Sequence, residues 1–190
     1  VAVVTAPQAV RGCVARRKLG FLLRLVESDL CDSAARLDLF QFCVRHQARG
    51  IKKVNSQELA HLNNLMTETN DEPWRFEQVE VAIPGGSIHL FNLVSNPINK
   101  ARDLCGQASQ QAGNGEAVEA ALNLYIELVL AHLFNDANRR TAVLATIWIL
   151  ENAGIEVDEQ KLLDLPLGDL RADADRKIFE EKFRKLVAEG

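Results

Sequence analysis

The sequence predicts an all-α protein with one β-hairpin, and three observations lead to this prediction. Two strongly apolar stretches, residues 122–131 and 142–150, are long enough for helices and flank a short polar segment. Strict alternation of apolar and polar residues is convincing only over residues 78–90. Elsewhere the apolar residues recur at helical spacing. We therefore expect a helical bundle that carries a single hairpin.

Length and charge limit the classes of protein that fit. The chain has 190 residues, 47% of them hydrophobic, which suits one domain with a sizeable core, or one domain with a helical appendage. The net charge of -4 argues against a general nucleic-acid binder, so no direct nucleic-acid partner is expected. No run of 18 apolar residues exists, so we expect neither a transmembrane helix nor a membrane partner.

The cysteines and the first residues bear on the compartment. The four cysteines form no Cys-x-x-Cys pair, which favours reduced thiols in a reducing compartment over a zinc site or a disulfide framework. Residues 1–10 are apolar but lack a leading charged region, so a signal peptide is not expected. The chain begins with Val rather than Met, which fits a piece of a longer protein. Together these features predict a cytoplasmic protein, in the bacterial cytosol or in a host cytosol.

The N-terminal part of the chain predicts helices. Apolar residues follow helical stripes over residues 19–26 and 37–44, and Gly50 is expected to end the second helix. A shorter helix is expected to begin at Ser56 and to end before Pro73. Residues 1–70 are therefore predicted to be an N-terminal helical region that precedes a core of residues 71–190, the two forming one continuous domain.

Residues 74–92 interrupt the helical pattern and predict a hairpin. The apolar positions alternate with polar ones on either side of Pro84-Gly85-Gly86, a turn signal because Pro presets one dihedral and Gly allows positive φ. An isolated hairpin is marginal in water, so this one must lean on the helices. Its free edge fits either a binding surface or a plain structural ribbon over the bundle. The alternation is formed by Val79, Val81, Ile83, Ile88 and Leu90.

The second half of the chain predicts further helices separated by breaks that contain Gly or Pro. Gly154 is expected as the residue that ends the second of the two apolar helices. The expected spans are 98–111, 116–133, 138 or 139 to 154, 158–163 and 169–187.

The polar segment between the two apolar helices predicts a ligand that carries phosphate. Burying this much polarity costs free energy unless it meets a charged partner. Asn138, Arg139 and Arg140 are expected where the second helix starts, an end that binds anions through unpaired N–H groups. Cations at that end repel the helix dipole, and a bound polyphosphate would offset the cost. Arginine also pairs with phosphate through a planar fork.

Two further residues in this segment supply the remaining chemistry. A lone carboxylate beside phosphates, here Asp136, is a usual way to hold Mg²⁺. The neutral ring of His132 can take a proton from an attacking hydroxyl near pH 7. A base, a metal ligand and a phosphate clamp are the parts needed for transfer from a nucleotide to an alcohol. Each residue alone also fits a core histidine, a helix cap or a solvated cation, so a structural helical interaction domain stays an alternative.

The segment His132-Leu133-Phe134-Asn135-Asp136-Ala137-Asn138-Arg139-Arg140 resembles the signature of the Fic/Doc (Fido) family, His-x-Phe-x-Asp/Glu-Gly/Ala-Asn-x-Arg. Clear similarity spans about residues 116–157, and the similarity in layout reaches back to the hairpin. The resemblance implies a Fido-type helical bundle with the motif between two central helices. It also implies that residues 74–92 are a flap that pairs with an extended segment of a target protein.

The resemblance implies a role for each motif residue. His132 would be the general base for a Ser, Thr or Tyr hydroxyl of the target, and Asp136 would hold Mg²⁺. Phe134 would anchor the loop in the core. The donor would be ATP or another nucleoside triphosphate. The residues that would bind the nucleotide, through side chains or backbone N–H groups, are Ala137, Asn138, Arg139 and Arg140.

The resemblance also implies partners. The target would be a protein with an accessible hydroxyl, for example a translation factor or a GTPase. Many Fic proteins carry an inhibitory Ser/Thr-x-x-x-Glu-Gly/Asn helix, and neither Glu151-Asn152 nor Glu189-Gly190 is preceded by the required Ser or Thr. A separate antitoxin-like inhibitor is therefore expected if activity is controlled. The flap residues expected to contact the target are Val79, Val81, Ile83, Gly85, Gly86 and Ile88.

The residue at position 139 bears on which group is transferred. Family members that transfer AMP usually have Gly there, which lets a phosphate approach the backbone. The Doc branch, the death-on-curing toxins of toxin–antitoxin pairs, has Ala-Asn-Lys-Arg, and Ala137-Asn138-Arg139-Arg140 is nearer to it. We therefore expect a Doc-like enzyme that transfers a phosphoryl group. AMP transfer (AMPylation) stays as an alternative, because Arg and Lys are not interchangeable at a phosphate. A catalytically degenerate nucleotide-binding relative is a further alternative, although the motif keeps both His132 and Asp136.

Overall fold

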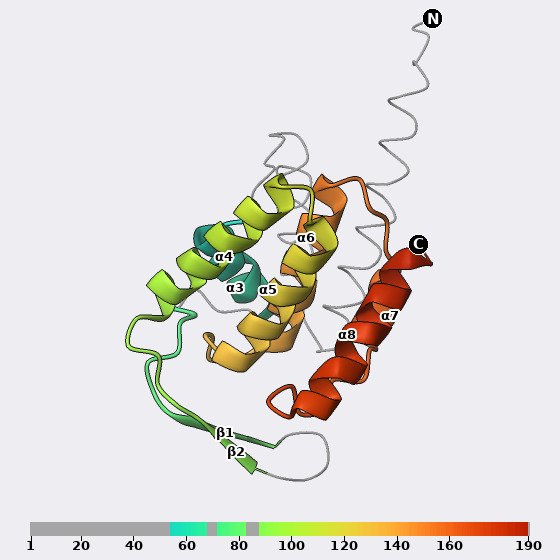
Figure 1. Ribbon diagram of the computed structural model, residues 1–190. Helices are drawn as coiled ribbons and strands as arrows, with labels where there is room; N and C mark the ends of the chain where they lie inside the picture. Colours follow the sequence, from blue (N-terminus) through green and yellow to red (C-terminus); the bar gives the residue numbers. More distant parts are fainter. Residues whose placement is uncertain (1–53, 68–71, 83–87, 190) are drawn as a thin grey trace, which may run out of the picture. The chain divides into compact units, whose positions relative to one another are not determined.

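Figure 1 shows the computed structural model of the chain, which describes residues 54–67, 72–82 and 88–189. The chain divides into two compact units, residues 1–51 with 65–68, and residues 52–64 with 69–190. The fold given below is that of the second unit. The helices predicted within residues 11–48 lie outside the described residues, and the predicted division at residue 70 stays a prediction.

The described residues form helices and one two-stranded antiparallel hairpin, which confirms the predicted fold class. The elements are α3 (Ser56–Thr67), β1 (Val79–Ala82), β2 (Ile88–Phe91), α4 (Pro97–Gly113), α5 (Ala117–Ala131), α6 (Asn138–Asn152), α7 (Glu159–Leu163) and α8 (Asp173–Ala188).

Helices α5 and α6 form the centre of the bundle, and α5 packs against both α4 and α6 (Figure 1). Both central helices are apolar around most of their circumference, as expected for helices surrounded by others. Helix α6 ends at Asn152 with Ala153 as its C-cap, two residues before the Gly154 predicted to end it. Gly154 follows the cap, and its φ of 76° is the left-handed conformation that favours Gly. The N–H of Ile155 then donates to the carbonyl of Leu150 at 2.9 Å and closes the helix end.

Helix α8 begins at Asp173 rather than at the predicted position 169. Gly168, at φ 59°, turns the chain, and the N–H of Asp169 donates to Asp175 Oδ2 at 2.8 Å. The carbonyl of Asp169 accepts from the N–H of Ala172 at 2.8 Å. Asp169 is therefore part of a turn that precedes the helix, and the prediction was wrong because this turn takes the residues assigned to the first helical turn.

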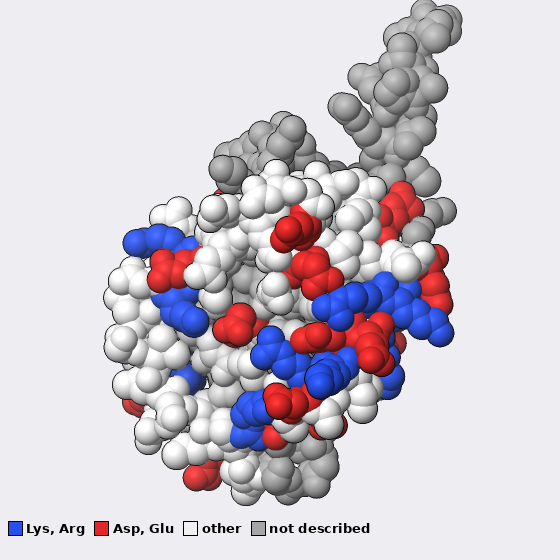
Figure 2. Space-filling model, in the orientation of Figure 1, with Lys and Arg blue, Asp and Glu red and all other residues white. Residues whose placement is uncertain are grey.

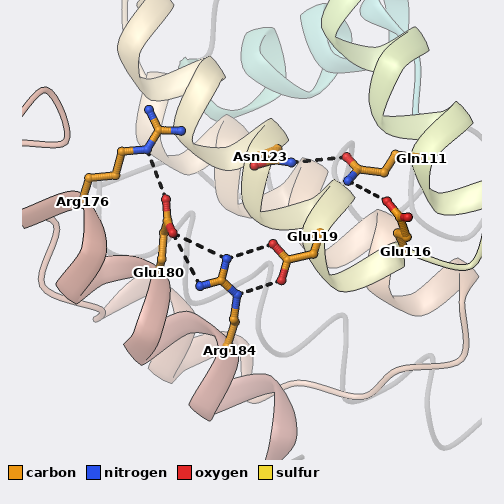
Figure 3. Close-up of polar contacts among 7 residues, drawn as sticks. All are labelled: Gln111, Glu116, Glu119, Asn123, Arg176, Glu180 and Arg184. Atoms are coloured by element: carbon orange, nitrogen blue, oxygen red, sulfur yellow. Dashed lines mark hydrogen bonds and ion pairs between the residues drawn. The ribbon is translucent and has the colours of Figure 1, made fainter. Parts of the chain in front are cut away.

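Helix α8 is attached to α5 by one aromatic contact and one charged cluster. The ring of Phe179 stacks on that of Tyr125, with centroids 4.9 Å apart. Arg184 makes a forked pair with Glu119 at 2.7 and 2.9 Å and also contacts Glu180 (Figure 3). On the face shown in Figure 2, basic and acidic residues alternate over this region without a broad patch of one sign.

The hairpin extends beyond the end of the bundle where α5 finishes (Figure 1). Its register pairs Val79 with Phe91 and Ala82 with Ile88. Exposure alternates along both strands, so one face is half-buried and the other is exposed. Ile88 lies on the exposed face, at 70% exposure, whereas Val79 and Val81 lie on the half-buried face. The predicted turn residues Ile83, Gly85 and Gly86 lie outside the described residues.

Candidate functional site

The polar motif forms the loop between α5 and α6, and two left-handed residues mark its ends. His132 has φ 46° and Ala137 has φ 55°, and these are the non-glycine residues with positive φ in the described part of the chain. Each costs about 1–2 kcal/mol relative to a right-handed conformation. Such strain persists only where the surroundings enforce it, and it is common at functional sites.

Asn138 enforces the loop conformation from inside. Its Oδ1 accepts the N–H of Phe134 at 2.9 Å, and its Nδ2 donates to the carbonyl of Phe134 at 2.8 Å. The Asn138 side chain is buried, so both backbone groups of Phe134 are satisfied without water. The structure thus places the Asn138 side chain on the loop backbone, and what this residue can offer a phosphate is its own N–H group.

The segment before the hairpin holds the loop from outside. The N–H of Arg75 donates to the carbonyl of Leu133 at 2.8 Å, and the N–H of Asn135 donates to the carbonyl of Pro73 at 3.0 Å. Between these bonds the ring of Trp74 stacks on that of Phe134, with centroids 4.9 Å apart. Phe134 is 1% exposed, so the structure places it in the core.

Helix α3 contributes a further contact to the loop. The Nδ2 group of Asn63 donates to the carbonyl of Asp136 at 2.9 Å and to Thr141 Oγ1 at 3.0 Å. Thr141 Oγ1 in turn donates to the carbonyl of Ala137 at 2.9 Å. Asn63 is 1% exposed, so this amide fixes the end of the loop from within the core.

The environment of the His132 ring keeps it neutral. The ring is half-buried and stacks on Phe91 of β2, with centroids 4.4 Å apart. Burial lowers the pKa of His132 from its usual 6.5 to about 4, and the Arg75 charge adds to the decrease, whereas Asp136 opposes it. A neutral imidazole is therefore available as a proton acceptor at pH 7.

Asp136 of the loop and Arg140 of α6 form a charged pair. Arg140 Nη2 is 3.8 Å from Asp136 Oδ2, and the side chain of Arg140 is 17% exposed whereas that of Asp136 is 77% exposed. The other carboxylate oxygen of Asp136 accepts the N–H of Ala137 at 2.5 Å. The charged pair thus combines a largely buried guanidinium with a largely exposed carboxylate.

The donor set fits Mg²⁺ of the kind that takes most of its ligands from substrate and water. The described residues contain no group of three or more His, Cys, Asp or Glu side chains that would form an all-protein cage. A single exposed carboxylate, Asp136, is the arrangement expected where nucleotide phosphates complete the octahedron. The residues present are thus compatible with a nucleotide-bound Mg²⁺.

Arg139 points away from this pair toward the C-terminal part of the chain. Its Nη2 donates to the carbonyls of Leu163 and Leu165 at 2.6 and 2.7 Å, and its Nε donates to the Tyr125 hydroxyl at 3.3 Å. The predicted role of Arg139 at a nucleotide stays a prediction, but in this structure its guanidinium connects the start of α6 to the end of α7.

Comparison with known proteins identifies the family. The Fic/DOC family model matches residues 53–150, which is more than half of the chain and includes the whole loop. The chain belongs to the Fic/DOC family. This confirms the family that the motif suggested. No curated protein matches the chain in sequence.

Solved structures share the Fic/DOC fold with this chain at low sequence identity. One is a Fic domain containing signaling protein from Bacteroides thetaiotaomicron VPI-5482, with a TM-score of 0.66, 14% identity and coverage of 95% of this chain and 86% of the other. Another is a Fic family protein from Desulfovibrio desulfuricans G20, with a TM-score of 0.58, 15% identity and coverage of 98% and 68%. At this identity the likeness shows the fold alone.

The site of this Fic/DOC chain includes residues that sequence reasoning did not single out. Asn63, Trp74, Arg75 and Phe91 all contact the motif loop or its histidine. The one available signal was Arg75, a charged residue beside an aromatic at the start of a segment that otherwise alternates. The others carry no local pattern that distinguishes them from ordinary core or surface positions.

A groove in this Fic/DOC chain lies away from the motif. A groove of about 250 Å³ runs between α4 and α5, and no motif residue lines it. The lining residues of the groove are Leu104, Gln107, Ala108, Gln111, Ala120, Asn123, Leu124 and Glu127.

None of the helices in the described part of the chain combines the length and apolar character that a bilayer crossing requires.

Proposed function

We propose that this protein transfers a phosphate-containing group from a Mg²⁺-bound nucleoside triphosphate, with ATP as the first choice, to a Ser, Thr or Tyr hydroxyl of a target protein. One observation supports the proposal most directly. The loop carries the neutral His132 imidazole at the end of α5, and the exposed Asp136 carboxylate and the largely buried Arg140 guanidinium lie at the start of α6. These are a base, a metal ligand and an anion clamp in one short segment.

The proton acceptor in this proposal is His132. The target hydroxyl oxygen attacks phosphorus and forms the new P–O bond, while the bond from phosphorus to the leaving phosphate oxygen breaks. The hydroxyl proton moves to the imidazole, which is unprotonated at pH 7; the lowered pKa of His132, about 4, keeps the ring neutral but also makes it a weaker base than a free histidine. The fixed backbone of the left-handed residue and the Phe91 ring hold the imidazole in one orientation.

The anion clamp is the start of α6. This helix has no side-chain cap, so its first N–H groups face the loop with the positive end of the helix dipole behind them. Arg140 adds a guanidinium that its burial holds in place. Asp136 would hold Mg²⁺, which when bound neutralises phosphate charge and polarises the phosphorus centre.

Phosphoryl transfer is the group transfer that the sequence favours, since Ala137-Asn138-Arg139-Arg140 is nearer to the Doc pattern. One observation favours AMP transfer as a second candidate. The Arg139 guanidinium is held on the carbonyls of Leu163 and Leu165, so it does not occupy the phosphate approach that Gly leaves open in members that transfer AMP. Phosphoryl transfer releases a nucleoside diphosphate, whereas AMP transfer releases pyrophosphate.

The hairpin is the proposed docking site for the target. Its exposed face carries Ile88 and Leu90, at 70% and 45% exposure. Among the described residues no third strand pairs with the ribbon, so its edges would accept a strand of the target. A target segment that pairs with this ribbon would lie close to His132, because Phe91 of the same strand touches the imidazole. The proposed target is a cytoplasmic protein such as a translation factor or a GTPase. The proposed regulator is an antitoxin-like inhibitor.

The deciding experiment uses the full chain with Mg²⁺ and bacterial lysate. ATP labelled at the α phosphate and ATP labelled at the γ phosphate are supplied in parallel, and proteins are resolved by gel. Labelling from γ only indicates phosphoryl transfer, and labelling from α indicates AMP transfer. His132→Gln serves as the matched control and should abolish labelling while nucleotide binding, measured by calorimetry, persists.

The same experiment identifies the two other classes. If the chain binds nucleotide but labels nothing with either donor, it is a non-catalytic relative. If the chain binds no nucleotide, and Arg140→Gln alters neither nucleotide binding nor labelling, the motif is a structural turn and the proposed function is wrong.

A further inference from the structure

We infer that Arg75 is a positioning residue that couples the hairpin to the loop carrying His132, so that the two open and close as one unit. Arg75 precedes β1 in the chain and is 3% exposed. Its side chain bridges the base of the hairpin and the end of α5.

The hydrogen bonds of the Arg75 guanidinium define this role. Its Nε donates to the carbonyl of His132 at 2.6 Å. Its Nη2 donates to the carbonyl of Asn92 at 2.9 Å, and its Nη1 donates to the carbonyls of Phe91 and Glu77. Glu77 precedes β1, whereas Phe91 and Asn92 end β2 and follow it. One side chain therefore closes both strands of the hairpin and contacts the residue that ends α5.

The chemistry explains why the residue is Arg and why its charge can be buried. A guanidinium presents five N–H donors in a fixed plane, which suits several carbonyls in different directions, whereas Lys presents three donors at one point. Within the described residues its partners are all backbone carbonyls. His132 is the C-cap of α5, so the cation lies at the negative end of that helix dipole.

Phe91 provides a second connection between the hairpin and His132, in addition to the Arg75 guanidinium. Phe91 gives its carbonyl to Arg75 and its ring to the His132 imidazole, at a centroid distance of 4.4 Å. Displacing the hairpin would therefore disturb two contacts of His132 at once, the bond from Arg75 to its carbonyl and the packing of Phe91 on its ring. Since coupling is reciprocal, a change at the loop must also reach the hairpin.

The consequence for catalysis rests on the proposed function. A target strand added to the hairpin would steady the His132 imidazole through Arg75, whereas the nucleotide contacts at the start of α6 would not depend on it. Substitution of Arg75 should therefore lower kcat and raise the KM for the target, and leave the KM for nucleotide unchanged.

The test measures coupling directly and needs neither nucleotide nor target. Arg75→Gln removes the charge and most donors, and Arg75→Lys keeps the charge but loses the fork. The matched controls are the same two changes at Arg102, an exposed arginine of α4. Amide hydrogen exchange by mass spectrometry is followed over the hairpin and the loop, and the His132 ring is followed by NMR.

Arg75→Gln should raise exchange about tenfold or more in residues 79–82, 88–91 and 132–137 together, because bonds to a charged donor are lost. The His132 ring resonances should shift, and α4 should not change. Arg75→Lys should give the same pattern with smaller factors. Faster exchange in the hairpin alone, with unchanged loop and ring resonances, would show that Arg75 only anchors the hairpin and would overturn the inference.

A measurement on the unaltered chain covers the case in which the variants do not fold. Native-state exchange in rising urea should give the hairpin and loop amides one common opening transition. Separate transitions at different urea concentrations would overturn the coupling. Because none of these readouts involves transfer, loss of the transferase proposal would leave the coupling intact, and loss of the coupling would leave the transferase proposal intact.

Discussion

The ring of Phe91 stacks on the imidazole of His132, with centroids 4.4 Å apart and planes 27° from parallel. The contact joins the second strand of the hairpin to the residue that ends α5. Two parts of the chain with different predicted tasks, target docking and proton transfer, thus share one packed interface.

The first prediction concerns pH. The pKa of His132 is lowered by burial and by Arg75 to about 4, against 6.5 in an unfolded chain. Between those values the unfolded state binds more protons, so stability should fall as pH decreases from 6.5 toward 4 and should gain nothing further from this group above 6.5. NMR titration of the ring should give a midpoint near 4.

The control for the pH prediction is His132→Gln, which should flatten the pH dependence of urea unfolding over the same range. A ring midpoint close to 6.5 in the folded chain would contradict the packing described for this residue.

The second prediction concerns catalysis. His132→Ala should lower transfer to target about 10²–10⁴-fold, because a positioned general base typically contributes that much. Calorimetry should show nucleotide affinity preserved, since the proposed clamp lies on α6. His61, an exposed histidine of α3, is the matched control, and His61→Ala should leave transfer unchanged. Normal labelling by the His132 variant would remove its assigned role.

The third prediction concerns the loop. Asn138→Ala should cost roughly 2–4 kcal/mol in the free energy of unfolding, because it leaves the N–H and the carbonyl of Phe134 without their side-chain partners. Asn123→Ala, at an exposed asparagine of α5, should cost under about 0.5 kcal/mol. Equal losses in urea denaturation would mean that the loop does not depend on the Asn138 side chain.

The fourth prediction separates the two attachments of α8. Phe179→Ala should destabilise by about 3–5 kcal/mol, because it removes a buried ring that stacks on Tyr125. Arg184→Ala should cost at most about 1 kcal/mol, since its pair with Glu119 is largely solvated, and the cost should shrink in high salt. A larger loss from the arginine would mean that the cluster in Figure 3, not the aromatic contact, holds the helix.

The fifth prediction concerns the transferred group. The Doc resemblance implies that the cation at position 139 sets the orientation of the nucleotide, and on that basis Arg139→Gly should raise AMP transfer relative to phosphoryl transfer. Mass spectrometry of the modified target separates the two products. An unchanged ratio would indicate that the contacts of Arg139 with Leu163 and Leu165 already keep it from the phosphates.

Within the described residues, the local sequence was sufficient to predict the helices and the hairpin, though not all of their ends, and to suggest the family. Helical spacing and alternation are properties of neighbouring residues, so they predicted the bundle, the hairpin and the glycine turn that follows α6. The motif from His132 to Arg140 is contiguous, so it was visible without a fold. The start of α8 was predicted wrongly because Asp169 bonds within a turn that hydrophobic spacing does not report.

The tertiary structure alone decided which groups hold the motif in place. Asn63 contacts Asp136 and Thr141 across 73 and 78 residues, and Arg75 contacts His132 across 57. Tertiary packing also decided that the Asn138 amide bonds to the loop backbone and that Arg139 bonds to the carbonyl of Leu163 at the end of α7. It likewise decided that Ile88 lies on the exposed face of the hairpin. Such contacts depend on how distant segments pack, and periodicity within one segment carries no record of them.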